Sequence, residues 1–178
     1  MLIGLTGLKQ SGKSTAGEFL ARNYGFHHTS FAEPMRRFAM DLFRMNELQL
    51  EALKEQPLPM LDYKVTPREF MQKLGTEFAR EMIHPDLWVR ACLMRIDPKR
   101  PTVVSDVRFA NEAHAIRAMG GKIIQVRRRG QERTDGHASE AGIESALIDH
   151  LLDNDGHDLR KFEDGVRGLM RWLYNGDV

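Results

Sequence analysis

The stretch LIGLTGLKQSGKST, residues 2–15, decides the fold of this chain. It opens with a short apolar run from Leu2 to Thr6, which is typical of a buried parallel strand. Gly7 to Ser14 then match the pattern G-x-x-x-x-G-K-[ST] without a mismatch, and apolar residues at helical spacing follow up to Tyr24. A strand, this loop and a helix in that order predict a phosphate-binding P-loop rather than an ordinary glycine turn.

The residues of this loop suit a nucleoside triphosphate. Glycines let the backbone wrap a phosphate with its N–H groups pointing inward, and the helix that follows adds its positive N-terminal end. Lys13 can reach the β- and γ-phosphates, and the Ser14 hydroxyl can ligate Mg²⁺, so we expect ATP and Mg²⁺ as cofactors. The motif alone does not separate a kinase from an NTPase switch or motor. The expected ATP-binding residues of the loop are Lys9, Ser11, Gly12, Lys13, Ser14 and Thr15.

Length and composition narrow the class of protein. A chain of 178 residues suits one domain, and 42% apolar with 29% charged residues is typical of a globular one. A formal net charge of +1 argues against a domain whose main task is to coat nucleic acid or an acidic membrane. Cys92 is the only cysteine, so no internal disulfide can form, and no apolar run approaches the length that spans a bilayer. We therefore expect a cytoplasmic protein.

Beyond the loop, strand patterns alternate with helix patterns. Thr66-Pro67-Arg68-Glu69 is a clear helix start, because threonine caps, proline takes the first helical position and glutamate completes a capping box. The alternation predicts an α/β fold with a parallel sheet. The expected strands are residues 2–6, 26–31, 102–105, 122–126 and 147–152. The expected helices are residues 13–24, 34–45, 48–55, 66–83, 85–96, 112–119 and 158–174.

A second polar group follows the strand expected at residues 102–105. Asp106 stands where many P-loop proteins place an acidic residue near the metal, and ligands of open α/β sheets lie beyond the carboxyl ends of the strands. Arg108 and Glu112 come next along the chain. The alternative is structural, with Asp106 and Arg108 forming a helix entry and a surface ion pair, and Glu112 favouring the helix dipole. The residues alone leave both interpretations open.

Residues 127–145 are polar, rich in arginine and irregular in pattern. A mobile loop of arginines can close over phosphates and neutralise developing charge. A solvated charged loop is the commoner fate of such a run. A nucleic-acid patch is a third interpretation, which the lack of interleaved aromatic residues weakens. The arginines concerned are Arg127, Arg128, Arg129 and Arg133.

One face of the helix expected at residues 66–83 is polar but contains a glycine. Glycine costs about 1 kcal/mol against alanine inside a helix, so Gly75 indicates a close approach either of a ligand or of another helix. Trp88 could stack on a base or fill the core, and the core is the commoner place for it. The polar face consists of Arg68, Gln72, Gly75, Thr76 and Arg80.

Three further segments, taken with the P-loop, resemble a known family. They are 66–77 with 84–89, 105–112 with 118–121, and 137–142 with 153–156. Together they resemble the deoxynucleoside monophosphate kinases of tailed bacteriophages, over nearly all the chain except about residues 46–64. The P-loop alone is generic, whereas the other three segments together are specific.

The resemblance implies ATP-dependent phosphoryl transfer to a deoxynucleoside 5′-monophosphate, for dNTP supply in DNA synthesis. It implies a P-loop NTPase fold with a parallel five-stranded sheet flanked by helices, as a single kinase domain. The core would span about residues 1–45 and 97–178, with a helical acceptor-binding region at 46–96 and an arginine-rich lid at 127–147. The deoxynucleotide would be the partner, with neither nucleic acid nor membrane, and a homodimer is left open. A phage-encoded enzyme would act in the host cytoplasm.

The resemblance also assigns roles to residues. Those implied at the acceptor are Arg68, Gly75, Thr76, Trp88, Asp106, Arg108, Glu112 and Ser139. Those implied at the adenine of ATP are Asn154, Asp155 and Gly156. Those expected to act in catalysis are Lys13, Arg68, Arg108 and Arg128.

The expected chemistry needs little from a general base. The acceptor phosphate is already anionic near neutral pH, so positioning and charge neutralisation would do most of the catalysis. Three alternatives are left open: a P-loop kinase of another small acceptor such as dephospho-coenzyme A, a nucleotide-gated binding protein with slow ATP hydrolysis, and a nucleic-acid-binding module.

Overall fold

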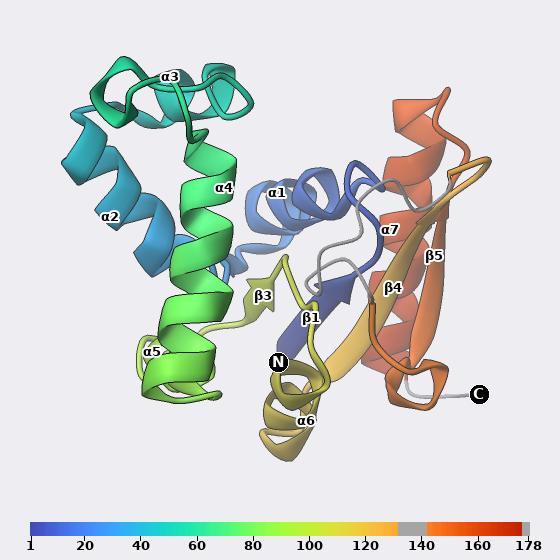
Figure 1. Cartoon of the computed structure of the whole chain (residues 1–178). Coiled ribbons are helices and arrows are strands. Elements are labelled where there is room, and N and C mark those ends of the chain that lie inside the picture. Colours follow the sequence, from blue (N-terminus) through green and yellow to red (C-terminus); the bar gives the residue numbers. More distant parts are fainter. Residues whose placement is uncertain (132–141, 176–178) are drawn as a thin grey trace. The chain divides into compact units, whose positions relative to one another are not determined.

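The chain folds into two compact units in the computed structural model, which describes residues 1–131 and 142–175 (Figure 1). Residues 1–30 and 96–178 form one unit, called the sheet unit, and residues 31–95 form the other, called the helical unit. Each has its own cluster of buried apolar side chains. The helical unit begins at Phe31, whereas the sequence suggested a boundary near residue 46.

The sheet unit contains the expected parallel sheet of five strands. Its strands are β1 (Leu2–Thr6), β2 (His27–Thr29), β3 (Thr102–Val104), β4 (Lys122–Arg128) and β5 (His150–Asn154). Their order is β2-β3-β1-β4-β5, and every neighbouring pair is parallel. β1 therefore lies at the centre, and its carboxyl end leads directly into the phosphate-binding loop.

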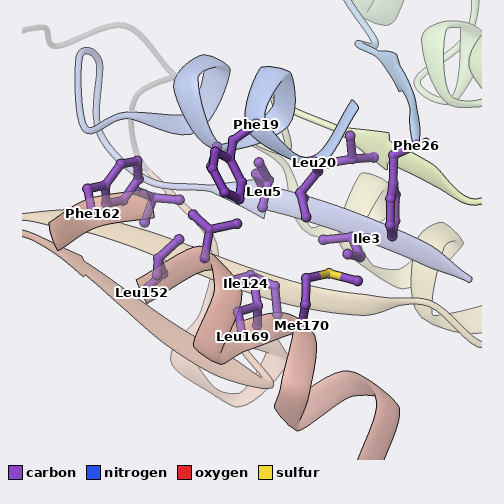
Figure 2. Close-up of a cluster of buried hydrophobic side chains, with 14 residues drawn as sticks. Ile3, Leu5, Phe19, Leu20, Phe26, Ile124, Leu152, Phe162, Leu169 and Met170 are labelled. Carbon is purple, nitrogen blue, oxygen red and sulfur yellow. The ribbon is translucent and has the colours of Figure 1, made fainter. Parts of the chain in front are cut away.

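Helices cover both faces of this sheet. α1 (Lys13–Tyr24) and α7 (Leu159–Asn175) pack on the face that carries Ile3, Leu5 and Ile124, which belong to the buried cluster in Figure 2. Successive strand residues point to opposite faces, so Gly4 lies on the other face, against Ile116 of α6 (Ala110–Ala118). A Cβ at Gly4 would lie 2.7 Å from the Ile116 side chain, so glycine lets α6 approach β1 closely.

The helical unit is built from short helices. They are α2 (Glu33–Phe43), α3 (Glu47–Ala52), the 3₁₀ turn η1 (Pro59–Leu61), α4 (Pro67–Gln72), η2 (Lys73–Ile83) and α5 (Leu87–Leu93). The predicted capping box at Thr66 and Glu69 is confirmed, with N–H to side-chain oxygen distances of 3.1 and 2.9 Å. Phe43 and Phe70 meet edge to face, with ring centroids 5.1 Å apart, in the core of this unit. Among the described residues, no helix combines the length and the apolar character that crossing a membrane requires.

Several expected elements differ from the structure in type or bounds, including the following three. The helix predicted at residues 66–83 is present, but its second part, η2, is π-helical. The last strand covers residues 150–154 rather than 147–152, because residues 145–147 form a 3₁₀ turn. β4 extends to Arg128, so the expectation of an irregular segment from Arg127 onward was wrong for Arg127 and Arg128.

Candidate active site

The P-loop joins β1 to α1 in a backbone conformation that depends on glycine. Gly7 has φ 138° and Gly12 has φ 112°, both in a region that side chains other than glycine rarely adopt. A Cβ at Gly7 would collide with the carbonyl oxygen of Val126 in β4. Gln10 also has a positive φ, of 63°, which the surrounding contacts must hold in place. The glycine spacing in the motif therefore matches the places where the backbone needs it.

Two polar groups of this loop bear on phosphate binding, the Lys13 ammonium and the Ser11 hydroxyl. The Lys13 ammonium donates to the carbonyl oxygens of Gly7 and Leu8, at 2.8 and 2.6 Å, so it is held over the loop. The Ser11 hydroxyl oxygen is buried and has no hydrogen-bond partner among the described residues. A buried polar atom of this kind usually has a partner, and an oxygen of a phosphate bound in the loop would be one. The P-loop residues thus fit a phosphate chain, with Ser14 exposed at the start of α1.

The outer side of the loop is held by three side chains. Gln131 Nε2 donates to the Lys9 carbonyl. Arg128 Nη1 donates to the Gln10 carbonyl at 3.3 Å, and Asn154 Nδ2 donates to the Ser11 carbonyl at 2.9 Å. Three consecutive loop carbonyls therefore each receive one donor. We call Arg128, Gln131 and Asn154 the carbonyl clamp; sequence analysis missed Gln131, because nothing local marks it.

The loop between β5 and α7 was expected beside adenine, and its side chains contact the protein itself. Asn154 Oδ1 accepts the N–H of Gly156 at 2.9 Å. Asp155 accepts the N–H groups of His157 and Asp158 and pairs with Lys161 at 2.9 Å. The hydrogen bond from Lys161, followed by those backbone N–H groups, holds the pKa of Asp155 well below its usual range. Contact of residues 154–156 with a nucleotide stays a prediction.

Glu112, in the first turn of α6, stabilises the segment that leads from β3 into this helix. Its side chain is buried, and Oε2 accepts the N–H groups of Arg108 and Phe109 at 2.7 and 3.1 Å. Glu112 thereby holds the backbone at Arg108, a contact that the sequence analysis did not foresee. Asp106 and Arg108 are half-buried here, and their contact with an acceptor stays a prediction.

His28 is a further polar residue at this edge that the sequence analysis did not select. Its Nε2 lies 2.8 Å from the Ser105 hydroxyl, next to Asp106 in sequence. A Cβ at Gly17 of α1 would lie 2.6 Å from the same nitrogen, so a glycine makes room for the imidazole. The pairing register could have indicated this contact, because β2 lies beside β3 with Thr29 opposite Val104.

In the helical unit, Gly75 is explained by packing. A Cβ there would lie 2.6 Å from the Met35 sulfur, which favours the helix-contact alternative over ligand approach. Trp88 Nε1 donates to the Gly75 carbonyl at 2.9 Å, which ties α5 to η2. Thr76, beside them, is half-buried. Acceptor binding by Gly75, Thr76 and Trp88 stays a prediction.

Arg68 belongs to a group of three cations brought together from separate segments. We call Arg36, Lys54 and Arg68 the basic cluster; their side chains are only 21%, 20% and 16% exposed. Burial lowers the pKa of Lys54, and repulsion by Arg68 and Arg36 lowers it further, against the attraction of Glu51. The sequence analysis missed Arg36 and Lys54, since only the fold places them near Arg68.

Exposed glutamates neutralise this basic cluster. Glu47 and Glu51 lie 3.3 and 3.4 Å from the Arg36 guanidinium, and Glu51 also lies 3.3 Å from Lys54 Nζ. Arg68 Nε donates to Glu55 at 2.5 Å. The three carboxylate side chains are 75%, 58% and 58% exposed. They can rotate into water, whereas the cation side chains are mostly buried.

The expected lid lies only partly within the described residues. Arg127, at the end of β4, pairs with Asp153 of β5 at 2.8 Å, and both side chains are exposed. The hydrogen bond from Arg127 lowers the pKa of Asp153. Ser139 and Arg133 lie outside the described residues. Within residues 1–131 and 142–175, no three His, Cys, Asp or Glu side chains gather as a metal cluster.

Comparison with known proteins supplies the family. A family model described as deoxynucleotide monophosphate kinase matches residues 45–164. The chain belongs to that family. A protein of Acanthamoeba polyphaga mimivirus that carries the name deoxynucleotide monophosphate kinase is 35% identical over 161 residues, covering 82% of this chain and 83% of the relative. The deoxynucleoside-5′-monophosphate kinase of Escherichia phage T5 is 32% identical over 120 residues, covering 62% of this chain but 45% of the phage protein.

Solved structures with a similar fold are more distant in sequence. TT1252 from Thermus thermophilus has a TM-score of 0.51 and 19% identity, covering 100% of this chain and 98% of that one. The dephospho-CoA kinase from Campylobacter jejuni has a TM-score of 0.50 and 14% identity, covering 99% and 98%. At these identities the likeness shows the fold alone, which is that of the P-loop kinases. It lends no support to dephospho-coenzyme A as the acceptor for this chain.

Proposed function

We propose that this chain is an enzyme that transfers the γ-phosphoryl group of ATP to a deoxynucleoside 5′-monophosphate, giving the diphosphate. One observation carries the proposal: a chain of the deoxynucleotide monophosphate kinase family has a P-loop in which the Lys13 ammonium is held against the loop and the buried Ser11 hydroxyl oxygen has no hydrogen-bond partner among the described residues. The family match covers most of the helical unit, and the P-loop lies outside the matched residues. Sequence relationship and local geometry therefore support the same activity independently.

The donor half of the site is the P-loop. Its N–H groups and the Lys13 ammonium would hold the β- and γ-phosphates, with Lys9, Gly12 and Thr15 completing the loop's contacts. Magnesium, when bound, supplies charge neutralisation on these phosphates, and Ser14 is the residue that would hold it.

The acceptor half would rest on the basic cluster of the helical unit. A monophosphate ester carries close to two negative charges at pH 7, and arginine binds phosphate through two parallel hydrogen bonds. Arg36 and Lys54 extend the role expected of Arg68 alone. The exposed glutamates pair with the three cations until an acceptor phosphate takes the place of the carboxylates. For Arg108 of the sheet unit, acceptor binding is a separate expectation, and Glu112 holds its backbone N–H.

Catalysis in this proposal is positional and electrostatic. The acceptor oxygen is already ionised, so no residue has to remove its proton. Lys13, Arg68 and Arg108 neutralise charge on the phosphoryl groups, and the same expectation for Arg128 stays a prediction. Exclusion of water keeps the phosphoryl group from hydrolysis.

The decisive experiment is ADP release from ATP and Mg²⁺ with a panel of deoxy- and ribonucleoside monophosphates and dephospho-coenzyme A. We expect turnover with particular deoxynucleotides, lowered about 10²- to 10³-fold in Lys13→Ala, because a preorganised donor to the phosphates is lost. Turnover with dephospho-coenzyme A and with no deoxynucleotide would mean that the chain is a kinase of that other acceptor. ATP binding without any acceptor-dependent ADP release would leave a nucleotide-gated binding protein instead.

A further inference from the structure

The carbonyls of a P-loop face away from the phosphate that its N–H groups bind. No regular ladder satisfies them, so each needs a donor from elsewhere in the protein. In this chain the carbonyls of Lys9, Gln10 and Ser11 receive their donors from side chains more than a hundred residues away in sequence. These donors come from the ends of β4 and β5 and from the turn that follows β4.

We propose that the carbonyl clamp, Arg128, Gln131 and Asn154, sets the phosphate-binding shape of the P-loop from its outer side. The three are positioning residues: they act on ATP through the loop backbone, without needing to touch the nucleotide. Gln10 has a positive φ of 63°, an unfavoured conformation for glutamine, and its carbonyl is the one that Arg128 holds. The clamp thus braces the loop at its strained residue and on both sides of it.

Two members of the clamp have their polar groups committed to the protein. Asn154 donates to Ser11 and accepts from Gly156, so one amide links the P-loop to the loop before α7. Arg128 donates through Nη2 to the Gly156 carbonyl, also at 3.3 Å. A Cβ at Gly156 would lie 2.7 Å from Arg128 Nε, so this glycine gives the guanidinium its place. The loop before α7 and the P-loop are therefore held as one piece.

The test measures phosphate binding separately from turnover. Asn154→Asp keeps the acceptor for Gly156 and removes the donor to Ser11. Asn23→Asp is the matched control, because Asn23 Nδ2 also donates to a backbone carbonyl at 2.9 Å, near the far end of α1. Gln131→Met removes the donor to Lys9 at nearly constant size and without a charge. The probes are ATP, inorganic tripolyphosphate and adenosine, each followed by equilibrium binding.

We expect Asn154→Asp and Gln131→Met each to weaken binding of ATP and of tripolyphosphate about fivefold, as the loss of one hydrogen bond would. In Gln131→Met, adenosine binding and the KM of the acceptor should hold steady, and kcat should fall less than kcat/KM for ATP. Arg128→Lys, which retains the charge, should lie between the wild type and Arg128→Met. Asn23→Asp should bind all probes normally.

Two results would overturn the proposal. One is unchanged tripolyphosphate binding in both Gln131→Met and Asn154→Asp; the other is a loss in Asn23→Asp equal to that in Asn154→Asp. This inference rests on the proposed function in one respect only, which is that ATP is the phosphate donor. Failure of the kinase assay with intact clamp effects on tripolyphosphate would reject the acceptor and not the clamp. If Asn154→Asp does not fold, Gln131→Met and Arg128→Lys still decide the question.

Discussion

Neutralising Glu51 in the helical unit should improve binding of the deoxynucleotide acceptor. Glu51 contacts two members of the basic cluster, at 3.4 Å from Arg36 and 3.3 Å from Lys54 Nζ. Burial alone would raise the pKa of Glu51, but Lys54 and Arg36 outweigh it, so its pKa is lowered and the carboxylate stays charged at neutral pH. If an acceptor phosphate binds these cations, it must displace this carboxylate. Glu51 is then an internal competitor, and Glu51→Gln removes it.

The size of the change in acceptor KM follows from the exposure of the two ion pairs that Glu51 makes. Exposed ion pairs contribute about 0.2–1 kcal/mol each, and Glu51, with a side chain 58% exposed, makes two of them. Losing both contacts corresponds to roughly 0.5–1.5 kcal/mol after solvent screening, or about a two- to tenfold lower KM for the acceptor. The same loss should lower the free energy of unfolding by a similar amount, because the pairs also stabilise the fold. Raising the salt concentration should shrink both effects.

The assay is the KM for the best deoxynucleotide at two ionic strengths, with the KM for ATP measured alongside. Glu81→Gln is the control, because Glu81 is an exposed glutamate of the same unit and this substitution removes the same charge. Arg68→Met should change the acceptor KM in the opposite direction. An acceptor KM that rises in Glu51→Gln, or that falls equally in Glu81→Gln, would refute the reasoning. An unchanged KM with a lower Tm would mean that the pairs serve the fold alone.

Three further predictions concern single positions in the sheet unit. Gly7→Ala should abolish ATP binding, because the new Cβ would meet the Val126 carbonyl at an unfavourable φ; ATP binding at normal affinity would contradict this. Gly168→Ala, inside α7 where a Cβ meets no atom within 4 Å, should raise stability by about 0.5–1 kcal/mol, seen as a Tm about 1–4 °C higher. Because the pKa of Asp155 is depressed in the folded state, its carboxyl binds a proton more tightly in the unfolded chain than in the folded one. The Asp155 carboxylate therefore stabilises the fold fully above about pH 4, and this stabilisation is lost as the pH falls further. Asp155→Asn should therefore flatten the fall of Tm below pH 4, and an acid profile identical to the wild type would count against that cause.

The sequence predicted the parts of the fold whose signals are local. β1, the P-loop and α1 were predicted at their observed bounds, because an apolar run, two glycines and a helical period follow one another within 24 residues. The start of α4 was predicted by its capping box. β4 was predicted too short, because Arg127 and Arg128 look like loop residues in sequence. They are in the strand because they pair with Asp153 and Asn154 across β5, which only the register shows.

The candidate site divides in the same way between local and distant signals. The P-loop motif is enough to select Lys13 from the sequence, and the position of Glu112 in a first helical turn is enough to select Glu112. Arg36 and Lys54 are ordinary charged residues in sequence, and they acquire a role only when Arg68 comes beside them. Gln131 is even harder to recognise in the sequence, because its partner Lys9 lies 122 residues away. Residues that serve a site from a distance leave no spacing pattern, so a single sequence cannot reveal them.

The sheet order explains why donor and acceptor effects should separate. β1 lies between β3 and β4, and β5 lies beyond β4, so the carboxyl ends of β4 and β5 meet the P-loop on one side only. Substitutions in the carbonyl clamp therefore reach ATP through the loop backbone. The basic cluster belongs to the helical unit and is proposed to bind the acceptor phosphate, so its substitutions should act on the acceptor KM. A variant such as Asn154→Asp and one such as Glu51→Gln should consequently combine with additive free energies, because they share no partner.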